Sequence, residues 1–165
     1  MPDATGLELL AAQLGDATLE TVYFRERATL VVDPARIRAV LQTLRAQGYA
    51  FLASVHGVDH HPEEPRLGVV YELLDMSRVD RVTVKLRVPI DAPRVESVTG
   101  DWPTADHQER EVYDMFGVVF EGHPDLRRIL MPEDYEGHPQ RRDFPLGGEP
   151  VIFTRDEAKW LERRE

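Results

Sequence analysis

The sequence predicts an α+β fold, a two-layer sandwich in which helices cover one face of a sheet. Two observations indicate this fold. Segments with helical periodicity and apolar segments typical of strands follow one another in the order α-β-β-α-β-β-β. The run at residues 81–88 alternates, with Val82 and Val84 on one side and Arg81 and Lys85 on the other. That pattern is typical of a sheet that packs on a core with one face and meets water with the other.

Each element has a local signal in the sequence. The first helix is expected at residues 5–15, where leucines form an apolar stripe. A hairpin follows, because two apolar-rich runs are joined by a charged tripeptide. The second helix has Asp33 as its N-cap, Pro34 in its first turn and Gly48 as its stop. The strands are expected at residues 18–24, 28–32, 49–58, 67–74 and 81–88.

A third helix is expected from about residue 103 to residue 116, where Gly117 ends it. After it the composition changes, since five prolines and five glycines fall between residues 117 and 150. A segment of this length without helix or strand is usually functional or disordered, and this one is too apolar for a solvated tail. We therefore expect an α+β domain at residues 1–117 and an extended Pro/Gly-rich C-terminal arm with a tail at residues 118–165. The arm is expected to pack on its own domain and on another protein.

The composition excludes several classes of function. A formal net charge of −10 argues against nucleic-acid binding and against adsorption to anionic lipid. The chain has no cysteine, which excludes disulfides and metal sites built on its own sulfur. No apolar run approaches the roughly 18 residues of a membrane-spanning helix, and no signal peptide opens the sequence. We expect a soluble cytosolic chain with no direct membrane span.

One cluster of histidines is a candidate for metal binding. His56, His60 and His61 lie close to Asp59 in the segment HGVDHH. On a strand, His56 and His60 share one face while Asp59 and His61 share the other, so the segment offers no simple local ligand set. A metal site also requires a matched set of ligands and supporting groups. These histidines are therefore expected at a solvated strand end.

The tetrapeptide Glu-Gly-His-Pro occurs twice, at residues 121–124 and 136–139, and an Arg-Arg pair follows each copy. His123 and His138 could not complete a transition-metal site alone. The favoured interpretation is a turn in which each imidazole bonds a backbone group or a carboxylate. The first arginine pair is expected to point to the acidic helix of its own domain, and the second to point outward to a partner.

The third helix carries a carboxylate in the middle of its apolar stripe. At helical spacing, Glu109 falls on the same face as Ala105 and Val112. A buried carboxylate must be paired, because an unsatisfied buried charge is costly. Arg127 and Arg128 are its expected partners, and the pairing would join the helix to the arm.

Two further pairs are expected on this helix at i,i+4 spacing, Arg110 with Asp114 and His107 with Glu111. Glu109 and Glu111 point roughly 200° apart and cannot act on one substrate atom as acid and base. The sequence also contains no nucleophile motif or phosphate-binding loop of recognised spacing. The favoured interpretation is a structural ion-pair node, with catalysis as the less favoured alternative.

The motif ERExxDMF at residues 109–116, followed by His123, Arg127, Ile129 and Leu130, resembles the signature of the 30-kDa subunit family of bacterial respiratory complex I. This complex is the proton-pumping NADH–quinone oxidoreductase. The continuation GHPDLRRILMPEDYEGHPxRRDFPL is also similar to that family, over roughly residues 30 to 150. Two positions differ from the usual family sequence, with Gln140 in place of Leu and Arg142 in place of Lys.

The resemblance implies a cofactor-free subunit of the peripheral arm, on the cytoplasmic side of the membrane. It implies partners that carry FMN and iron–sulfur clusters, in particular the subunit related to the hydrogenase large chain and the subunit with the terminal iron–sulfur cluster. No catalytic, cofactor-binding or metal residue is expected in this chain. The residues expected to be structural or partner-binding are Glu109, Arg110, Glu111, Asp114, His123, Arg127, Arg128, His138, Arg141, Arg142, Asp143 and Phe144.

Three alternatives stay open from the sequence. The chain could be the equivalent subunit of a related membrane-bound hydrogenase or of another quinone-linked dehydrogenase. It could be a stand-alone metalloenzyme that uses His56, His60, His123 and His138 with acidic neighbours. It could also be an acidic adaptor without a respiratory role. The short sequence after Trp160 leaves contacts of a longer C-terminus undefined.

Overall fold

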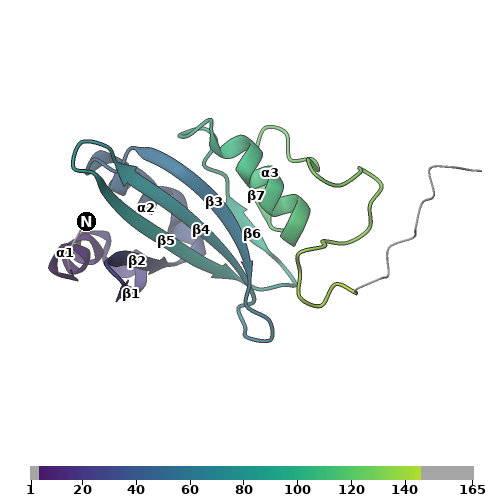
Figure 1. The fold of residues 1–165 in the computed structure, drawn as a ribbon, viewed down its shortest axis with the longest axis horizontal. Helices are drawn as coiled ribbons and strands as arrows, with labels where there is room; N and C mark the ends of the chain where they lie inside the picture. Colours follow the sequence, from purple (N-terminus) through teal and green to yellow (C-terminus); the bar gives the residue numbers. More distant parts are fainter. Residues whose placement is uncertain (1–3, 146–165) are drawn as a thin grey trace, which may run out of the picture.

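A computed structural model of the protein describes residues 4–145. Its centre is a five-stranded sheet with the strand order β1-β2-β5-β4-β3 (Figure 1). The pairing of β2 with β5 is parallel, and the other three pairings are antiparallel. All five expected strands are present, and they are β1 (Thr18–Phe24), β2 (Arg27–Val32), β3 (Phe51–Asp59), β4 (Leu67–Asp75) and β5 (Asp80–Val88).

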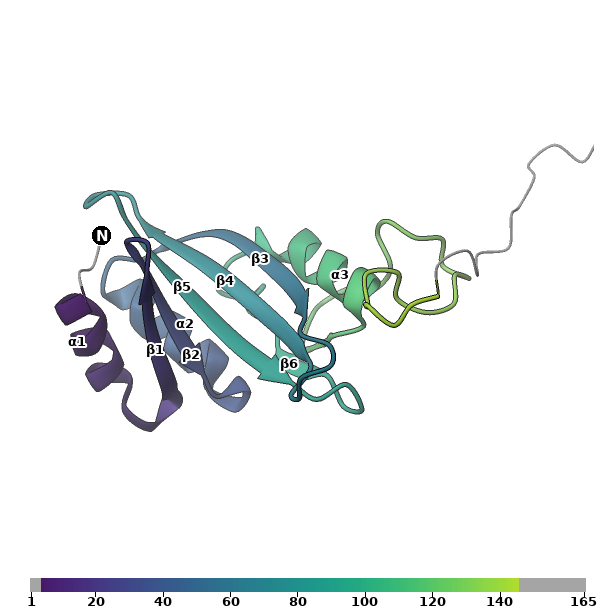
Figure 2. The same cartoon turned by 60° about the horizontal axis from the view of Figure 1, so that its bottom comes forward.

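Three α-helices cover one face of this sheet, in agreement with the predicted α+β class. They are α1 (Ala4–Leu14), α2 (Ile37–Ala46) and α3 (Ala105–Phe116), with short 3₁₀ turns at Gly15–Ala17 and Pro34–Arg36. Figures 1 and 2 show α2 behind the sheet and α3 beside its β3 edge. The side chain of Asp33 accepts a hydrogen bond from the N–H of Ala35 at 3.0 Å, so it caps the 3₁₀ turn Pro34–Arg36 that leads into α2, whose own N-cap residue is Arg36.

The core lies between the helices and the inward face of the sheet. Val82, Val84, Leu86 and Val88 of β5 are buried, and Arg81, Lys85 and Arg87 point to the open face. The alternation seen in the sequence is thus confirmed, except that Thr83 on the open side is also buried, where its hydroxyl donates to Glu72 at 3.0 Å. Helix α2 contributes Ile37, Val40, Leu41 and Leu44 to the same core.

A second, two-stranded sheet was not expected from the sequence. Strands β6 (Arg94–Glu96) and β7 (Val119–Glu121) pair in parallel next to α3. Val118 and Phe120 are buried in the core of the domain, although they lie in the segment expected to have no helix or strand. Strands of three residues have too little periodicity to be recognised, and their pairing depends on residues more than twenty positions apart.

Gly117 ends α3 in the left-handed conformation, with φ +78°, as the sequence predicted. Near the same end of the helix, the ring of Phe116 lies directly over Gly57 of β3. A side chain at position 57 would collide with this ring, so the glycine allows α3 to pack closely on the edge of the sheet. This contact fixes the end of α3 from which the C-terminal segment departs.

Candidate functional site

The candidate site is the segment at residues 122–145, which is called the arm below. It leaves β7, passes along α3 and reaches the end of β3 (Figure 1). The arm contains turns and bends but no helix or strand. Its backbone polar groups must therefore find partners elsewhere, and the structure shows that many of these partners belong to α3.

Asp114 holds the middle of the arm. Its Oδ2 accepts hydrogen bonds from three consecutive backbone N–H groups, those of Ile129 at 3.1 Å, Leu130 at 2.7 Å and Met131 at 2.9 Å. Its Oδ1 accepts from Arg128 at 2.6 Å. Burial alone would raise the pKa of this carboxyl, but the N–H donors of Met131 and Leu130 and the guanidinium of Arg128 outweigh it and lower the pKa. Asp114 is fully buried and charged, and it determines the path of the arm.

Two arginines extend this connection. Arg128 also donates to the carbonyl of Gly137 at 2.9 Å, and its guanidinium lies 5.8 Å from the ring centroid of Tyr135. Arg110 on α3 donates to the carbonyls of Arg127 and Arg128, each at 3.2 Å. The expected pair of Arg110 with Asp114 is therefore replaced, because the arm brings stronger donors to Asp114 and free carbonyls to Arg110.

The two Gly-His-Pro turns attach the arm to two different points of α3. His123 accepts from the N–H of Asp125 through Nδ1 at 3.0 Å, so its Nε2 donates to the carbonyl of Asp106 at 3.2 Å. His138 donates from Nδ1 to the carbonyl of Asp114 at 2.9 Å. Burial lowers the pKa of His138, and the nearby Arg141 and Arg128 add to this effect. The prediction that each imidazole bonds a backbone group is confirmed.

The arm also caps the C-terminal end of α3. The N–H of Gln140 donates to the carbonyl of Met115 at 3.2 Å, and Nε of Arg141 donates to the carbonyl of Phe116 at 2.7 Å. These carbonyls have no partner inside the helix, and a cation at this end is favourable to the helix dipole. The second arginine pair was expected to point outward to a partner. Arg141 instead binds a carbonyl at the end of α3, whereas Arg142 is exposed and its contact with a partner stays a prediction.

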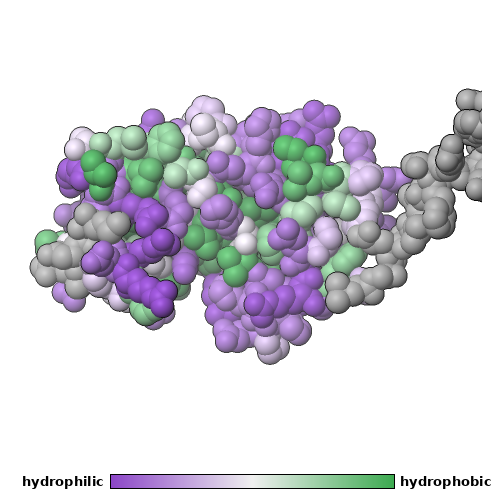
Figure 3. Space-filling model, in the orientation of Figure 1, coloured by the Kyte–Doolittle hydropathy of each residue, from purple (hydrophilic) through white to green (hydrophobic). Residues whose placement is uncertain are grey.

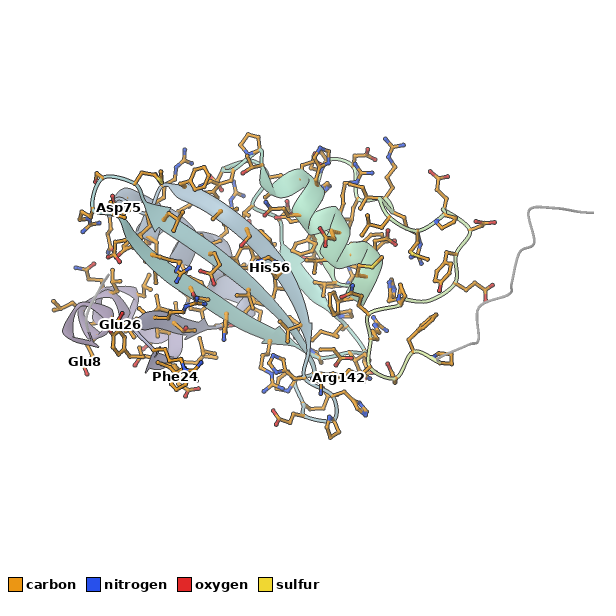
Figure 4. All side chains as sticks on the ribbon, viewed as in Figure 1. Glu8, Phe24, Glu26, His56, Asp75 and Arg142 are labelled. Atoms are coloured by element: carbon orange, nitrogen blue, oxygen red, sulfur yellow. The ribbon has the colours of Figure 1, made fainter. Side chains whose placement is uncertain are left out.

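The end of the arm is held by a buried ion pair at the end of β3. Arg66 lies 2.7 Å from Asp59 and 2.5 Å from Asp143 of the arm. The backbone N–H of Arg142 donates to Asp59 at 2.7 Å, and its side chain donates to the carbonyl of His61 at 3.2 Å. Figure 4 shows Arg142 beside the loop that joins β3 and β4. The hydrogen bonds from Arg66 lower the pKa of Asp59.

Sequence reasoning misses Arg66 and the role of Asp59, because the local pattern presents Asp59 only as a possible metal ligand among the neighbouring histidines. The alternation of β3 places Asp59 opposite His56 and His60. The position of Asp59 on the other face of the strand is the one signal in the sequence that separates it from the histidines. In the structure Asp59 is buried and His56 is exposed. Nothing local connects Arg66 with Asp143, which is 77 positions away.

Glu109 is buried as expected, but its predicted partners are wrong. Its Oε2 accepts from the hydroxyl of Ser97 at 2.7 Å, and its Oε1 accepts from the N–H of Val98 at 2.8 Å. Burial raises the pKa of this carboxyl, and the two hydrogen bonds oppose the rise. Arg128 pairs with Asp114, and Arg127 pairs with Asp125 on the surface. Ser97 and Val98, which directly follow β6, lie next to Glu109, so neutral donors occupy the position expected for the arginines.

The remaining predicted residues lie apart from this network. Glu111 is exposed, on a different side of α3 from Glu109. Phe144 stacks on Tyr135 with ring centroids 6.2 Å apart and lies against Gly137, so it packs the arm on itself. His107 lies 3.6 Å from Asp106, where a pair with Glu111 was expected.

The arm presents two apolar side chains to solvent. Ile129 is 39% exposed and Leu130 is 61% exposed, although the backbone N–H groups of both are bound to Asp114. Figure 3 shows a hydrophobic patch on the surface beside α3, in the region of the arm. The arm therefore exposes an apolar pair on a backbone that Asp114 holds in place.

Other kinds of site have no geometric support in the described part of the chain. Within residues 4–145, no group of three or more His, Cys, Asp or Glu side chains could hold a metal ion. Over the same residues, no helix is both long and apolar enough to cross a membrane.

The chain is similar to known respiratory proteins over most of its length. The family model described as "Respiratory-chain NADH dehydrogenase, 30 Kd subunit" matches residues 30–150. An NADH-quinone oxidoreductase subunit from Roseiflexus sp. (strain RS-1) is 47% identical over 157 residues, which cover 93% of this chain and 90% of that protein.

Two solved structures are similar as well. The trypsin-resistant fragment (1–134) of Nqo5 has a TM-score of 0.64 and 34% identity, and the match covers 76% of this chain and all of the fragment. A chain of the membrane-bound sulfane sulfur reductase, an archaeal respiratory membrane complex, has a TM-score of 0.72 and 26% identity. That match covers 96% of this chain and 88% of the other.

Proposed function

The chain belongs to the family of the 30-kDa subunit of respiratory-chain NADH dehydrogenase, and from this we propose that its arm binds the neighbouring subunits of the complex. It is a subunit of NADH–quinone oxidoreductase, an enzyme complex. Its contribution to the activity is structural: it holds peripheral-arm subunits in place while electrons pass from NADH to quinone.

The observation that carries this proposal is the Asp114 network. One buried carboxylate binds three consecutive N–H groups and Arg128, and the loop held in this way exposes Ile129 and Leu130. A loop with a fixed backbone loses little conformational freedom when it binds, so more of the contact energy is available for association. A buried apolar side chain supplies about 1.5–3 kcal/mol when it leaves water.

We also propose which subunits the chain contacts and on which side of the membrane it lies. The partners are the subunit related to the hydrogenase large chain and the subunit with the terminal iron–sulfur cluster. The complex lies on the cytoplasmic side of the membrane, and its FMN and iron–sulfur clusters are held by partner subunits. The lower identity to the sulfane sulfur reductase chain, 26% against 47% for the quinone-linked relative, supports the NADH–quinone enzyme over a related respiratory machine.

A matched pair of leucines tests the proposal. Leu130 on the arm and Leu9 on α1 are both 61% exposed, so an aspartate at either site replaces an apolar side chain of the same exposure. We expect Leu130→Asp to reduce co-purification of the chain with the other peripheral subunits, and Leu9→Asp to leave it unchanged. Far-ultraviolet circular dichroism and urea unfolding check that both variants fold. If Leu130→Asp assembles as well as Leu9→Asp, the arm is not the contact.

A further inference from the structure

The face of the sheet opposite the helices is uncovered in this structure. The register of β3, β4 and β5 shows which residues of these strands lie side by side on the open face. Lys85, Val70 and His56 form one row across the strands, and Gly68 lies between Arg87 and Val58 in the next row. Figure 4 labels His56 in the middle of β3, on the side turned to the viewer.

The charge of the open face is opposite to that of the chain. The protein has a formal net charge of −10. On these three strands, however, the outward positions carry three cations, Arg81, Lys85 and Arg87, and one carboxylate, Glu72. The carboxylate is already engaged, since Oε1 of Glu72 accepts from Thr83 at 3.0 Å and Oε2 lies 3.9 Å from Arg81. Lys85 and Arg87 therefore dominate the middle of the face.

Arg87 is weakly paired by the described residues. Within residues 4–145, its Nε and Nη2 have no hydrogen-bond partner. Its Nη1 is 3.5 Å from Glu63, whose side chain is 72% exposed. His60 lies next to it over Gly68, and burial together with the charge of Arg87 lowers the pKa of this histidine. Nε and Nη2 are buried, so an incoming carboxylate would reach Arg87 through Nη1 and take the place of the exposed Glu63 there.

Apolar side chains lie between these charges. Val70 is half-buried between Lys85 and His56, Val31 of β2 is paired with Lys85, and Val58 is half-buried near Arg87. Figure 3 views the molecule from this side and shows hydrophilic and hydrophobic residues interspersed across its middle. A mixture of arginine and apolar surface is typical of protein interfaces, whereas a net charge of −10 opposes adsorption to an anionic membrane.

We propose that the open face of the sheet is a second interaction surface, which binds an acidic segment of a neighbouring protein through Lys85 and Arg87. The segment lies across the strands, because Lys85 and Arg87 are on β5, the central strand of the sheet. Its carboxylates face Lys85 and Arg87, and its apolar side chains lie on Val70 and Val58. This surface is separate from the arm, so the proposal does not depend on the contact made by Leu130.

Zero-length cross-linking of the purified native complex tests the proposal. A carbodiimide joins a lysine amine to a carboxylate only where the two are in contact. The chain has two lysines, Lys85 and Lys159, so cross-linked peptides that contain Lys85 can be identified by mass spectrometry. We expect a cross-link from Lys85 to an acidic peptide of another subunit. A complex with Lys85→Arg keeps the charge and is expected to assemble normally without that cross-link.

Charge reversal gives a second readout on the assembled protein. Lys85→Glu is expected to weaken association with the complex roughly tenfold, in a salt-dependent way. Arg36→Glu, an exposed charge reversal on the helical side, is expected to change it little. The proposal is overturned if Lys85 gives no cross-link and Lys85→Glu assembles like Arg36→Glu. It is also overturned if the chain instead binds phosphatidylserine vesicles in a manner that depends on Lys85, which would make the face a membrane contact.

Discussion

The guanidinium of Arg128 lies 2.6 Å from the carboxylate of Asp114, in a pair whose side chains are 13% and 0% exposed. The adjacent Arg127 is 62% exposed and pairs with Asp125 at the surface. Two neighbouring arginines of the same motif therefore have different physical roles. One connects the arm to α3 in a site shielded from water, and the other is largely screened by solvent.

This difference predicts unequal effects of alanine at the two positions. Arg128→Ala leaves Asp114 buried with one fewer partner and is expected to cost about 3–5 kcal/mol. Arg127→Ala is expected to cost less than about 1 kcal/mol, because exposed ion pairs contribute little. Urea unfolding measures both values, and hydrogen exchange of residues 128–131 locates the effect. Equal losses in the two variants would contradict the assignment of Arg128 as the buried partner.

Glu109 should tolerate glutamine. Its pKa is raised by burial, and its two partners are a hydroxyl and a backbone N–H, neither of which needs a negative charge. Glutamine keeps an acceptor for Val98, and its amide can donate to Ser97. We expect Glu109→Gln to stay within about 1 kcal/mol of the parent at pH 7, while Glu109→Ala, which leaves a buried donor unsatisfied, costs about 1–3 kcal/mol or more. Similar losses in urea unfolding would show that Glu109 acts as a charge.

Binding of the arm at His138 should weaken as the solution becomes acidic. The pKa of His138 in the folded protein lies below its ordinary value of 6.5, chiefly because the imidazole is buried. Below pH 6.5 the detached or unfolded form takes up a proton first, so the stability present above that pH is lost as the pH falls toward the folded pKa. Around the ring, Arg128 and Arg141 oppose protonation and the carboxylate of Asp114 favours it.

Nuclear magnetic resonance titration of the His138 ring, with hydrogen exchange of residues 136–142 at pH 7.5 and 5.5, checks this prediction. His138→Gln serves as the control, because the pKa of His60 is also lowered and contributes a pH dependence of the same sign. The pH dependence of exchange in the arm should be reduced in that variant. A measured pKa for His138 at or above 6.5 would be incompatible with the prediction.

The ion pair between Asp59 and Arg66 should be more important than the contact between Arg66 and Asp143. The side chains of Asp59 and Arg66 are 2% and 7% exposed, whereas Asp143 is 50% exposed. Arg66→Met is expected to cost about 3–5 kcal/mol, since it leaves Asp59 buried without its cation. Asp143→Asn is expected to cost less than about 1 kcal/mol of global stability but to increase protease cleavage within residues 139–145. Cleavage unchanged from the parent would mean that Asp143 does not hold the arm.

Acid should act on the same ion pair from the carboxylate side. The folded pKa of Asp59 is depressed, first by the hydrogen bonds from Arg66. The stability that this pair contributes is present above the ordinary carboxyl pKa of 3.8 and is lost as the pH falls through the depressed value. The double variant Asp59→Asn with Arg66→Met should therefore lose stability less steeply than the parent below about pH 4 in thermal unfolding.

Local patterns were sufficient for the three α-helices and for the five strands of the main sheet. The alternation in β5, the cap at Asp33 and the stop at Gly117 each predicted a feature that the structure contains. The stripe of α3 also predicted that Glu109 is buried. These predictions succeeded because periods of 2 and 3.6 residues state directly which side of an element faces the core.

The partners of buried charges could not be predicted in the same way. Arg127 and Arg128 were expected to pair with Glu109 because the arm follows α3, but Ser97 and Val98 occupy that position, next to the pairing of β6 with β7. Asp114, which was expected to pair along its own helix, instead organises the arm. Hydrogen bonds between residues from distant parts of the chain produce no periodic pattern in the sequence, so they cannot be predicted from it.

The sequence by itself therefore determined the α+β fold, the open face of the sheet, the turns around His123 and His138, and the family of the chain. Only the tertiary structure decided that Asp114 holds the arm, that Arg66 joins Asp59 to Asp143, and that Ile129 and Leu130 remain exposed. The physical reason is that burial follows from local amphipathic patterns, whereas the satisfaction of a buried charge depends on which distant backbone groups reach it first.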